Sequence, residues 1–336
     1  MKHVQELTAD KNSLESYLKG QTWLQLNESI KAIEIPGDGN MNFTIRIKTS
    51  DRSFIIKQSR NYVEKYPQVP APEERALREA EFYQMVAEHE SLSRQMPQLK
   101  GVDKANHVLN LEDLGDGVDY TFLYQEVNSI SDSDLEQIMS FIAELHRCVN
   151  TKTTQTRLPN VEMRKLNHEH IFIYPYLDNN GLDLDDILPG LKAMGKSFKQ
   201  DENLKRKVEV LGERYLKDGN TLLHGDYFPG SWLKTGGGIK IIDPEFCFFG
   251  EVEFEIGVTL AHLKLADQPE TLIKKALGYY KEHSAIDESL CRQFMAVEIL
   301  RRILGLAQLP LSINLNKRET LLEQARAILT TASAGN

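Results

Sequence analysis

The sequence has few cysteines and no long apolar run, and both absences narrow the class of protein. Its 336 residues include three cysteines, none of them in a CxxC pair. So sparse and odd a set excludes a disulfide framework and predicts reduced thiols. No run approaches the roughly 18 apolar residues that a membrane-spanning helix needs, and the amino-terminal stretch does not resemble a signal peptide. We therefore expect a cytoplasmic protein that does not bind membranes.

Basic residues are also too few and too scattered for a nucleic-acid-binding chain. Lys and Arg number 40 against 49 Asp and Glu, which gives a formal net charge of −9. An acidic chain without a basic stripe is a poor candidate for binding a nucleic-acid backbone. Any anionic ligand must therefore be held by a few local cations, by backbone N–H groups or by a bound metal ion.

The first third of the chain changes from helical to strand-like patterns. Residues 7–30 have helical spacing, whereas alternating apolar and polar residues predict a β-hairpin from 43–48 and 53–59. The proline-rich stretch 61–73 reads as a loop, and 73–92 is strongly helical. One more strand and a turn follow in the stretch "HVLNLEDLGDG". This order predicts a mixed α+β lobe.

The rest of the chain is mostly helical. Residues 131–150 open with Ser and Asp in N-cap positions, and residues 252–332 keep helical periodicity. Two short apolar segments, "TLLHGD" and "GIKIIDP", are bracketed by glycines and read as strands, while 151–190 looks irregular. We expect an α+β fold of two lobes: a small N-terminal lobe, residues 1–113, and a larger helical C-terminal lobe, residues 114–336.

Three carboxylates accompany the two short apolar segments. Asp226 follows the first segment, and Asp243 and Glu245 follow the second. A hairpin through the turn "KTGGG" would bring these ends together, and the two aspartates with Glu245 as a third carboxylate would form a hard oxygen site of the kind that Mg²⁺ prefers. Asp226 could then accept a proton from an attacking hydroxyl. One alternative is that these acids only form turns, and another is that they are the carboxylate pair of a glycosidase. A serine hydrolase is not favoured, because Ser231 lacks the GxSxG elbow of that fold.

The N-terminal lobe favours phosphate chemistry. The glycine turn "PGDGNMN" precedes the hairpin, and its backbone could approach phosphates. Lys57 follows inside an apolar strand, where a lysine costs free energy unless it is paired. The next helix offers Glu79 and Glu81 as partners. Kinase-type folds hold a strand lysine on the nucleotide phosphates with a helix glutamate; the alternative is a lysine that extends to water from an edge strand.

These motifs together resemble the aminoglycoside phosphotransferase and choline kinase group, which has a protein-kinase-like fold, and within it the methylthioribose kinase subfamily. The resemblance spans nearly the whole chain through "EIPGDGNMNFTIRI", "SFIIKQS", "RALRE" and "LEDLG". It implies ATP as the nucleotide and favours Glu79 as the partner of Lys57. The nucleotide-binding residues that it implies are Gly37, Asp38, Gly39, Asn40, Asn42, Lys57, Glu79 and the backbone near Glu112 and Leu114.

The second half carries the catalytic and metal motifs of the same group. "HGDYFPGSW" resembles its catalytic loop, which implies that Asp226 is the catalytic base. Ser231 stands where the wider group has a metal-binding Asn, and the methylthioribose kinases also have Ser there. "IDPEFCFFG" resembles the metal segment, with Asp243 and Glu245 as Mg²⁺ ligands helped by Ser231. "EFEIG" resembles the helix that follows, with Glu255 where Asp is commoner.

Two adjacent arginines complete the set. Arg301 and Arg302 interrupt an apolar helix, so the two cannot both face a core, and at least one must find an anion or water. Guanidinium groups suit phosphoryl oxygens as that anion. "EILRRILGLAQL" resembles a twin-arginine segment of the methylthioribose kinases, which implies a catalytic role near the transferred phosphoryl group. The alternative is a surface pair bonded to a nearby acid such as Glu298.

The acceptor is the least defined part of the prediction. The chain is shorter than typical methylthioribose kinases, the segment 163–184 has no counterpart that we can place in them, and Tyr227 and Phe228 also differ. We expect an ATP- and Mg²⁺-dependent kinase for a small hydroxyl-bearing acceptor, with methylthioribose a candidate. The alternatives are another small alcohol, such as an aminoglycoside, choline or an amino-sugar, or a non-catalytic pseudokinase. The resemblance also implies a homodimer.

Overall fold

The chain forms two compact units. The structure is a computed structural model that describes residues 4–37, 39, 41–125 and 128–331. The first unit consists of segments 1–117 and 235–247, and the second of 118–234 and 248–336. Asp243 and Glu245 therefore belong to the same unit as the N-terminal residues. The segments that flank 235–247 on both sides belong to the second unit. The predicted lobe boundaries, 1–113 and 114–336, stay a prediction.

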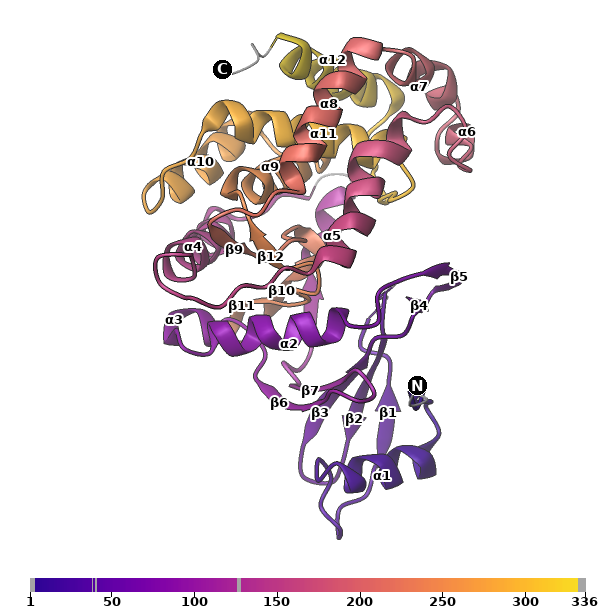
Figure 1. The fold of residues 1–336 in the computed structure, drawn as a ribbon, viewed down its shortest axis with the longest axis vertical. Coiled ribbons are helices and arrows are strands. Elements are labelled where there is room, and N and C mark those ends of the chain that lie inside the picture. The colour runs from indigo at the N-terminus through magenta and orange to yellow at the C-terminus, as the bar shows by residue number, and fades with distance from the viewer. Residues whose placement is uncertain (1–3, 38, 40, 126–127, 332–336) are drawn as a thin grey trace. The chain divides into compact units, whose positions relative to one another are not determined.

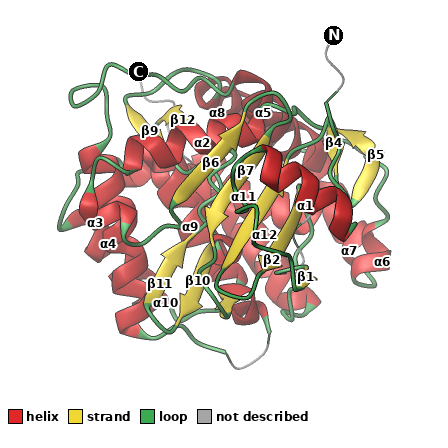
Figure 2. Cartoon of the chain, turned by 90° about the horizontal axis from the view of Figure 1, so that it is seen from below, coloured by secondary structure: helices red, strands yellow, loops and turns green. Residues whose placement is uncertain are grey.

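A five-stranded antiparallel sheet forms the centre of the first unit (Figure 2). Its order is β1 (Ala32–Glu34), β2 (Phe43–Lys48), β3 (Ser53–Gln58), β7 (Val108–Glu112) and β6 (Leu99–Asp103). The predicted hairpin is β2 and β3, paired with Ile45 opposite Ile56. β7 confirms the predicted third strand, whereas β6 was not predicted.

The two faces of this sheet have different partners. Phe54 and Ile56 of β3 pack in one hydrophobic cluster with Leu14 and Leu18 of α1 (Lys11–Gly20), and α1 lies over the strands in Figure 2. Because side chains alternate along a strand, Lys57 points to the opposite face. α2 (Arg75–Val86) contacts β6 and β7 and supplies Glu79 to that face.

Several predicted boundaries in the first unit were wrong. The predicted helix 7–30 is limited to α1, because Asp10 caps its start and the chain turns at Thr22, which has a φ of 61°. The predicted loop 61–73 contains the hairpin β4 (Tyr62–Val63) and β5 (Tyr66–Pro70), whose prolines are tolerated on a two-stranded edge. The remaining elements are α3 (Glu90–Ser93) and β11 (Gly238–Ile241).

The second unit is mostly helical (Figure 1). Its helices and turns are η1 (Tyr120–Tyr124), α4 (Asp132–Cys148), α5 (Val161–His168), η2 (Glu169–Ile173), η3 (Tyr174–Tyr176), α6 (Leu184–Ile187), α7 (Leu191–Lys199), α8 (Glu202–Tyr215), η4 (Pro229–Ser231), α9 (Val252–Leu265), α10 (Glu270–Lys281), α11 (Glu288–Leu304) and α12 (Leu315–Thr331). Its strands are β9 (Thr221–Leu223) and β12 (Phe248–Gly250), while the unit boundary falls within β8 (Gly117–Asp119) and β10 (Trp232–Thr235). Helix α9 is buried on nearly all sides and packs on α11, so it forms the core.

One predicted strand pairing was wrong, and one predicted cap is confirmed. We expected the segments that became β9 and β11 to pair, but β9 pairs antiparallel with β12, with Leu223 opposite Phe248. Strand partners are chosen by packing across the fold rather than by nearness in sequence. Ser131 caps α4 as predicted, because its side chain accepts a hydrogen bond from the backbone N–H of Asp134.

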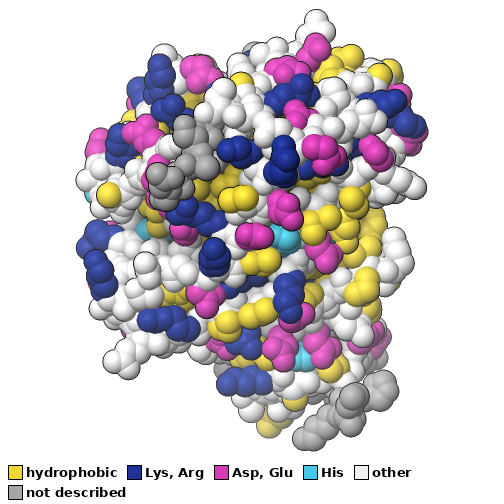
Figure 3. All heavy atoms as spheres, turned by 45° about the horizontal axis from the view of Figure 1, so that its top comes forward, with side chains coloured by type: hydrophobic (Ala, Val, Ile, Leu, Met, Phe, Trp, Pro, Cys, Tyr) yellow, Lys and Arg dark blue, Asp and Glu magenta, His cyan; other side chains and the backbone are white. Residues whose placement is uncertain are grey.

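Surface charge and hydropathy are consistent with the composition. On the face drawn in Figure 3, acidic and basic side chains are interspersed and the basic ones do not gather into a stripe. Among the helices of the described residues, none combines the length and the apolar character needed to cross a bilayer.

Candidate active site

Lys57 lies among the acidic residues of the first unit. Its side chain is 4% exposed, and its Nζ donates to Oε2 of Glu79 at 2.6 Å and to Oδ1 of Asp243. Burial by itself would lower the pKa of Lys57, but the carboxylates of Asp243 and Glu79 raise it, so the ammonium group stays charged. Arg78 donates to both oxygens of Glu81, so the structure pairs Lys57 with Glu79 and not with Glu81.

Asp243 is the most accessible acid beside Lys57. Its backbone is left-handed, with a φ of 66°, and its side chain is 51% exposed. One oxygen contacts Lys57, and a carboxylate has a second oxygen that suits a hard cation such as Mg²⁺. Within the described residues, no cluster of three or more His, Cys, Asp or Glu side chains forms a complete metal cage. Mg²⁺ fits here only with further oxygens from phosphate or water, which is its usual environment in nucleotide sites.

The predicted nucleotide-binding turn precedes β2. Gly37 and Gly39 are exposed, and a Cβ added to either would meet no atom within 4 Å, so their backbone is accessible. Asn42 is buried instead, and its Nδ2 donates to Oε2 of Glu245 at 2.9 Å. The same oxygen of Glu245, a predicted metal ligand, lies 3.3 Å from Nε of Arg75. The predicted nucleotide-binding residues Asp38 and Asn40 lie outside the described residues.

The backbone near Glu112 and Leu114, which the family resemblance implies binds the nucleotide, is held by Arg46 of β2 through the neighbouring Asp113 and Gly115. Arg46 Nε donates to Oδ1 of Asp113 at 3.1 Å, and its Nη2 donates to the carbonyl of Gly115 at 2.7 Å. Gly115 has a φ of 78°, which glycine adopts without a steric penalty. The backbone at the end of β7 is therefore held in one conformation. Adenine binding by the backbone near Glu112 and Leu114 stays a prediction.

In the second unit, α9 holds the loop that carries Asp226. The buried carboxylate of Glu255 accepts hydrogen bonds from the backbone N–H groups of His224, at 3.1 Å, and Gly225, at 2.7 Å. It also accepts one from Nε2 of His146 on α4, at 2.9 Å. One satisfied buried carboxylate therefore fixes the turn immediately before Asp226.

The remainder of this loop is fixed by side chains on both sides of Asp226. Ser231 Oγ donates to the carbonyl of Asp226 at 2.5 Å. Tyr227 is buried, and its hydroxyl donates to the carbonyl of Ile138 at 2.8 Å, while Thr259 Oγ donates to the carbonyl of Tyr227 at 3.1 Å. Tyr227 is therefore a packing residue. The metal-binding role of Ser231 stays a prediction.

Replacing Glu255 should weaken the fold. We expect Glu255→Gln to lower the free energy of unfolding by about 2–3 kcal/mol, because hydrogen bonds to a buried charge are strong and an amide NH₂ would face other donors. Denaturant unfolding followed by tryptophan fluorescence measures the change. Glu282→Gln removes the same charge from an exposed position and should cost less than about 0.5 kcal/mol. Equal stabilities of the two variants would contradict the anchoring role of Glu255.

Arg301 and Arg302 of α11 both bind the buried carboxylate of Glu298. Arg302 Nε donates to Oε1 at 2.5 Å, and Arg301 Nη1 donates to Oε2 at 3.1 Å. The Arg302 guanidinium also lies 5.3 Å from the ring centroid of Phe228, which connects α11 to the Asp226 loop. Burial works to lower the pKa of Arg302, but the carboxylates of Glu298 and Asp226 raise it. The alternative prediction, a surface arginine pair bonded to Glu298, is confirmed for the bond to Glu298. It is wrong about the surface position, because both arginines are buried.

His262 completes the buried cluster around Glu298. Its Nε2 donates to Oε1 of Glu298 at 3.2 Å, and its Nδ1 shares a 2.5 Å hydrogen bond with the hydroxyl of Tyr124. Burial lowers the pKa of His262 to about 4; the hydrogen bond to Glu298 opposes this, and the charge of Arg302 adds to it. The folded chain therefore keeps this imidazole neutral at a pH where the unfolded chain, with a His pKa of about 6.5, has protonated it.

Acid should destabilise the fold through His262. Between about pH 6.5 and about pH 4 the unfolded state binds this proton and the folded state does not, so stability falls as the pH falls. We expect His262 to contribute about 2–3 kcal/mol of that loss. His262→Gln should show a flatter dependence of the free energy of unfolding on pH than wild type, and the exposed control His283→Gln should match wild type. Identical slopes for all three would contradict a neutral His262.

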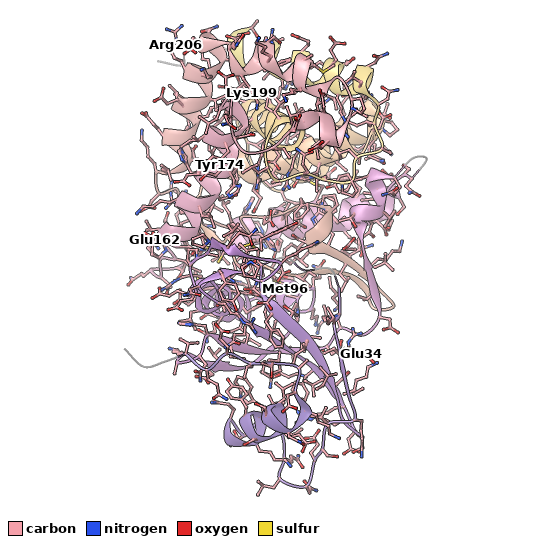
Figure 4. All side chains as sticks on the ribbon, turned by 90° about the vertical axis from the view of Figure 1, so that its right-hand side faces the viewer. Glu34, Met96, Glu162, Tyr174, Lys199 and Arg206 are labelled. Atoms are coloured by element: carbon pink, nitrogen blue, oxygen red, sulfur yellow. The ribbon has the colours of Figure 1, made fainter. Side chains whose placement is uncertain are left out.

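The expectation that 151–190 is irregular is wrong for 161–176, which is helical, and confirmed for 151–160 and 177–183, which form neither helix nor strand. Helix α5 continues into the π-helical turn η2 and the 3-10 turn η3, and Glu162 and Tyr174 mark the two ends of this run in Figure 4. Asn167 Oδ1 accepts a hydrogen bond from Nη2 of Arg301 at 3.3 Å, so the segment reaches the arginine pair. The role of residues 163–184 in binding the acceptor stays a prediction.

Sequence reasoning missed several residues that position the candidate site residues within each unit. They are Arg46, Arg75, His146, Thr259 and His262. A polar residue within an otherwise apolar helix face is a signal for His146 and His262, because a buried polar group needs a partner. That signal does not identify the partner, which in each case lies far away in the sequence.

The family comparison matches most of the chain. The model described as APH, phosphotransferase enzyme family, matches residues 32–288. A methylthioribose kinase of Exiguobacterium sibiricum is 29% identical over 259 residues, which are 73% of this chain and 63% of that protein. Methylthioribose kinase 1 of Oryza sativa subsp. japonica is 28% identical over 276 residues, 76% of this chain and 62% of that protein. The match thus spans less than two thirds of the length of these curated relatives.

Solved structures support the same assignment at the level of the fold. A spectinomycin phosphotransferase in complex with ADP and spectinomycin aligns with a TM-score of 0.54 at 15% identity, over 97% of this chain and 99% of that one. A choline/ethanolamine kinase family protein from Mesorhizobium loti aligns with a TM-score of 0.53 at 11% identity, over 95% and 99%. The predicted two-lobed α+β kinase-like fold is confirmed. With a family model that covers well over half of its length, the chain belongs to the phosphotransferase enzyme family.

Proposed function

We propose that the chain is an ATP- and Mg²⁺-dependent kinase that transfers the γ-phosphoryl group to a hydroxyl of a small, sugar-like acceptor, with methylthioribose as the first candidate. The buried Lys57, bonded to Glu79 and Asp243, carries the proposal. Burying an ammonium group between two acids costs free energy, and in kinases such a lysine binds the nucleotide phosphates. The names of relatives that are 28–29% identical to this chain support methylthioribose.

The first unit would hold the nucleotide. The accessible backbone at Gly37 and Gly39 would cover the phosphates, and Lys57 would bind their oxygens while Glu79 keeps the ammonium group in place. Asp243 would hold Mg²⁺ through the carboxylate oxygen that does not face Lys57. When bound, Mg²⁺ neutralises charge on the phosphates. Most of the rate enhancement would then come from positioning and electrostatics.

The second unit would act on the acceptor. The Asp226 carboxylate would orient the acceptor hydroxyl and take up its proton as the new O–P bond forms and the bond between the γ-phosphorus and the bridging oxygen breaks, which releases ADP. The fixed loop favours this role, because the hydrogen bonds of Glu255 and Ser231 hold the backbone from which the Asp226 side chain extends. Arg301 and Arg302 would offset the negative charge of the transferred group, and Asp226 is already among the charges that act on both guanidinium groups.

A panel of acceptors tests the proposal. Purified chain, ATP and Mg²⁺ are incubated with methylthioribose, other sugars, choline and an aminoglycoside, and ADP is measured. We expect ADP formation that depends on a sugar acceptor. Dependence on choline or an aminoglycoside alone would overturn the sugar assignment while keeping a kinase. ADP binding with no acceptor-dependent turnover across a broad panel would favour a pseudokinase.

A further inference from the structure

Arg75, the first residue of α2, is completely buried within the first unit. Its Nη1 donates to the carbonyls of Arg60, at 2.6 Å, and Pro72, at 2.8 Å; its Nη2 donates to those of Met41, at 2.6 Å, and Tyr62, at 3.2 Å. Figure 1 shows α2 starting directly after the β4–β5 hairpin. One guanidinium thus ties the end of the glycine turn, the hairpin and the start of α2 together.

The third donor of Arg75 closes a small network with two further residues. Its Nε donates to Oδ1 of Asn42 at 2.9 Å and lies 3.3 Å from Oε2 of Glu245. Asn42 Nδ2 donates to the same oxygen of Glu245 at 2.9 Å. Asn42 stands at the end of the nucleotide-binding turn, so this closed network connects that turn to the acidic segment.

The two acids of the Asp-Pro-Glu stretch have different surroundings. The Asp243 side chain is 51% exposed beside Lys57, whereas that of Glu245 is 6% exposed beside Arg75. A guanidinium buried without a counter-ion is strongly destabilising. If Glu245 turned away to bind a metal ion, Arg75 would lose its ion-pair partner and Asn42 would lose the acceptor for its Nδ2. The burial and contacts of Glu245 therefore favour a fixed structural position.

We propose that Glu245 is the counter-ion of Arg75 and not a metal ligand, and that Arg75, Asn42 and Glu245 together position the nucleotide-binding turn. This inference rests on the proposed function, because positioning has an effect only if the turn binds nucleotide. It leaves Asp243 as the acid of this stretch that would hold Mg²⁺. Arg75 and Glu245 are then positioning residues that act through the backbone of the turn.

Three variants test the inference: Arg75→Met, Glu245→Gln and the double variant. Calorimetry measures the Kd for ADP with Mg²⁺, and electron paramagnetic resonance measures the Kd for Mn²⁺ with ADP bound. We expect both single variants to weaken ADP binding by a similar factor of about ten, and the double variant to be no weaker than either single. The Kd for Mn²⁺ should change by the same small factor, below about threefold, in each variant.

The opposite pattern would overturn the inference. Outer-shell partners of metal ligands are themselves worth about 10–100-fold in metal affinity, so a loss of at least this size in Glu245→Gln without a matching loss in Arg75→Met would identify Glu245 as a ligand. Arg94→Met and Glu90→Gln remove the same charges from an exposed pair and should match wild type. If a single variant does not fold, Asn42→Ala removes the two hydrogen bonds of Asn42 to Arg75 and Glu245, leaves their ion pair in place, and should also weaken ADP binding.

Thermal unfolding separates failure of this inference from failure of the proposed function. A buried ion pair is coupled, so the double variant should lose less in Tm than the two single losses combined. Additive losses would contradict the pairing whether or not nucleotide binds. If wild type binds no ADP in the presence of Mg²⁺, the positioning role falls together with the proposed function, and a coupled Tm loss would support only the ion pair.

Discussion

Asp226→Asn should lower kcat by about 10²–10⁴-fold and leave the affinity for ATP with Mg²⁺ within about twofold of wild type. Asparagine keeps the size of the side chain but cannot take up the proton of the acceptor hydroxyl, and general-base catalysis is worth about this factor. The loop itself should persist, because its anchors are backbone groups bonded to Glu255 and the hydroxyl of Ser231. Steady-state kinetics and calorimetric ADP binding measure the two quantities.

The matched control for this variant is Asp186→Asn. Asp186 is exposed in α6 of the same unit, so the substitution removes one carboxylate without touching the loop, and it should leave kcat unchanged. If Asp226→Asn retains wild-type turnover, Asp226 is not the base. If ADP binding is lost together with turnover, the variant has disturbed more than proton transfer, and the division of work between the two units is wrong.

Asp243→Asn should remove the Mg²⁺ dependence of nucleotide binding and lower kcat/KM by at least about 100-fold. A bound metal ion contributes several kcal/mol of charge stabilisation, and each 1.36 kcal/mol is about tenfold in rate. Asparagine is the appropriate replacement, because it tolerates the left-handed backbone at this position, where φ is 66°. Calorimetry of ADP binding, with and without Mg²⁺, provides the measurement.

Asp267→Asn provides a closely matched control. Asp267 also has a left-handed backbone, with a φ of 52°, and it is likewise paired with a lysine, Lys317, at 2.6 Å. The same change of charge in the same backbone conformation should leave ADP binding and its Mg²⁺ dependence as in wild type. An Asp243→Asn variant that still binds ADP more tightly with Mg²⁺ than without it would count against Asp243 as the metal ligand.

Local features of the fold were predictable because local residues determine them. The β2–β3 hairpin follows from alternation on both sides of a polar turn, and Ser131 caps α4 because a serine before a helical pattern satisfies a backbone donor there. Lys57 attracted attention because a charged residue in an apolar strand must find a partner. One such partner is Glu79 of α2.

Long-range partners were not predictable from these patterns. β9 pairs with β12 instead of β11, because the neighbours of a strand depend on packing across the whole unit. His146 lies 109 residues from Glu255, and Arg75 belongs to a helix distant in sequence from Glu245. For the arginine pair, the need for an anion was predictable, but the degree of burial was not. The identity of the acceptor is equally unpredictable from local sequence patterns, because side chains from separate segments would select it.

Transfer of the labelled γ-phosphoryl group of ATP to methylthioribose tests the central claim most directly. Wild type and Asp226→Asn are incubated with γ-labelled ATP, Mg²⁺ and methylthioribose, and the products are separated by chromatography. The account predicts a labelled phosphate ester of the sugar with wild type, and at most about one-hundredth of that rate with the variant. Label that appears only as inorganic phosphate, or ester formation at equal rates by both proteins, would contradict it.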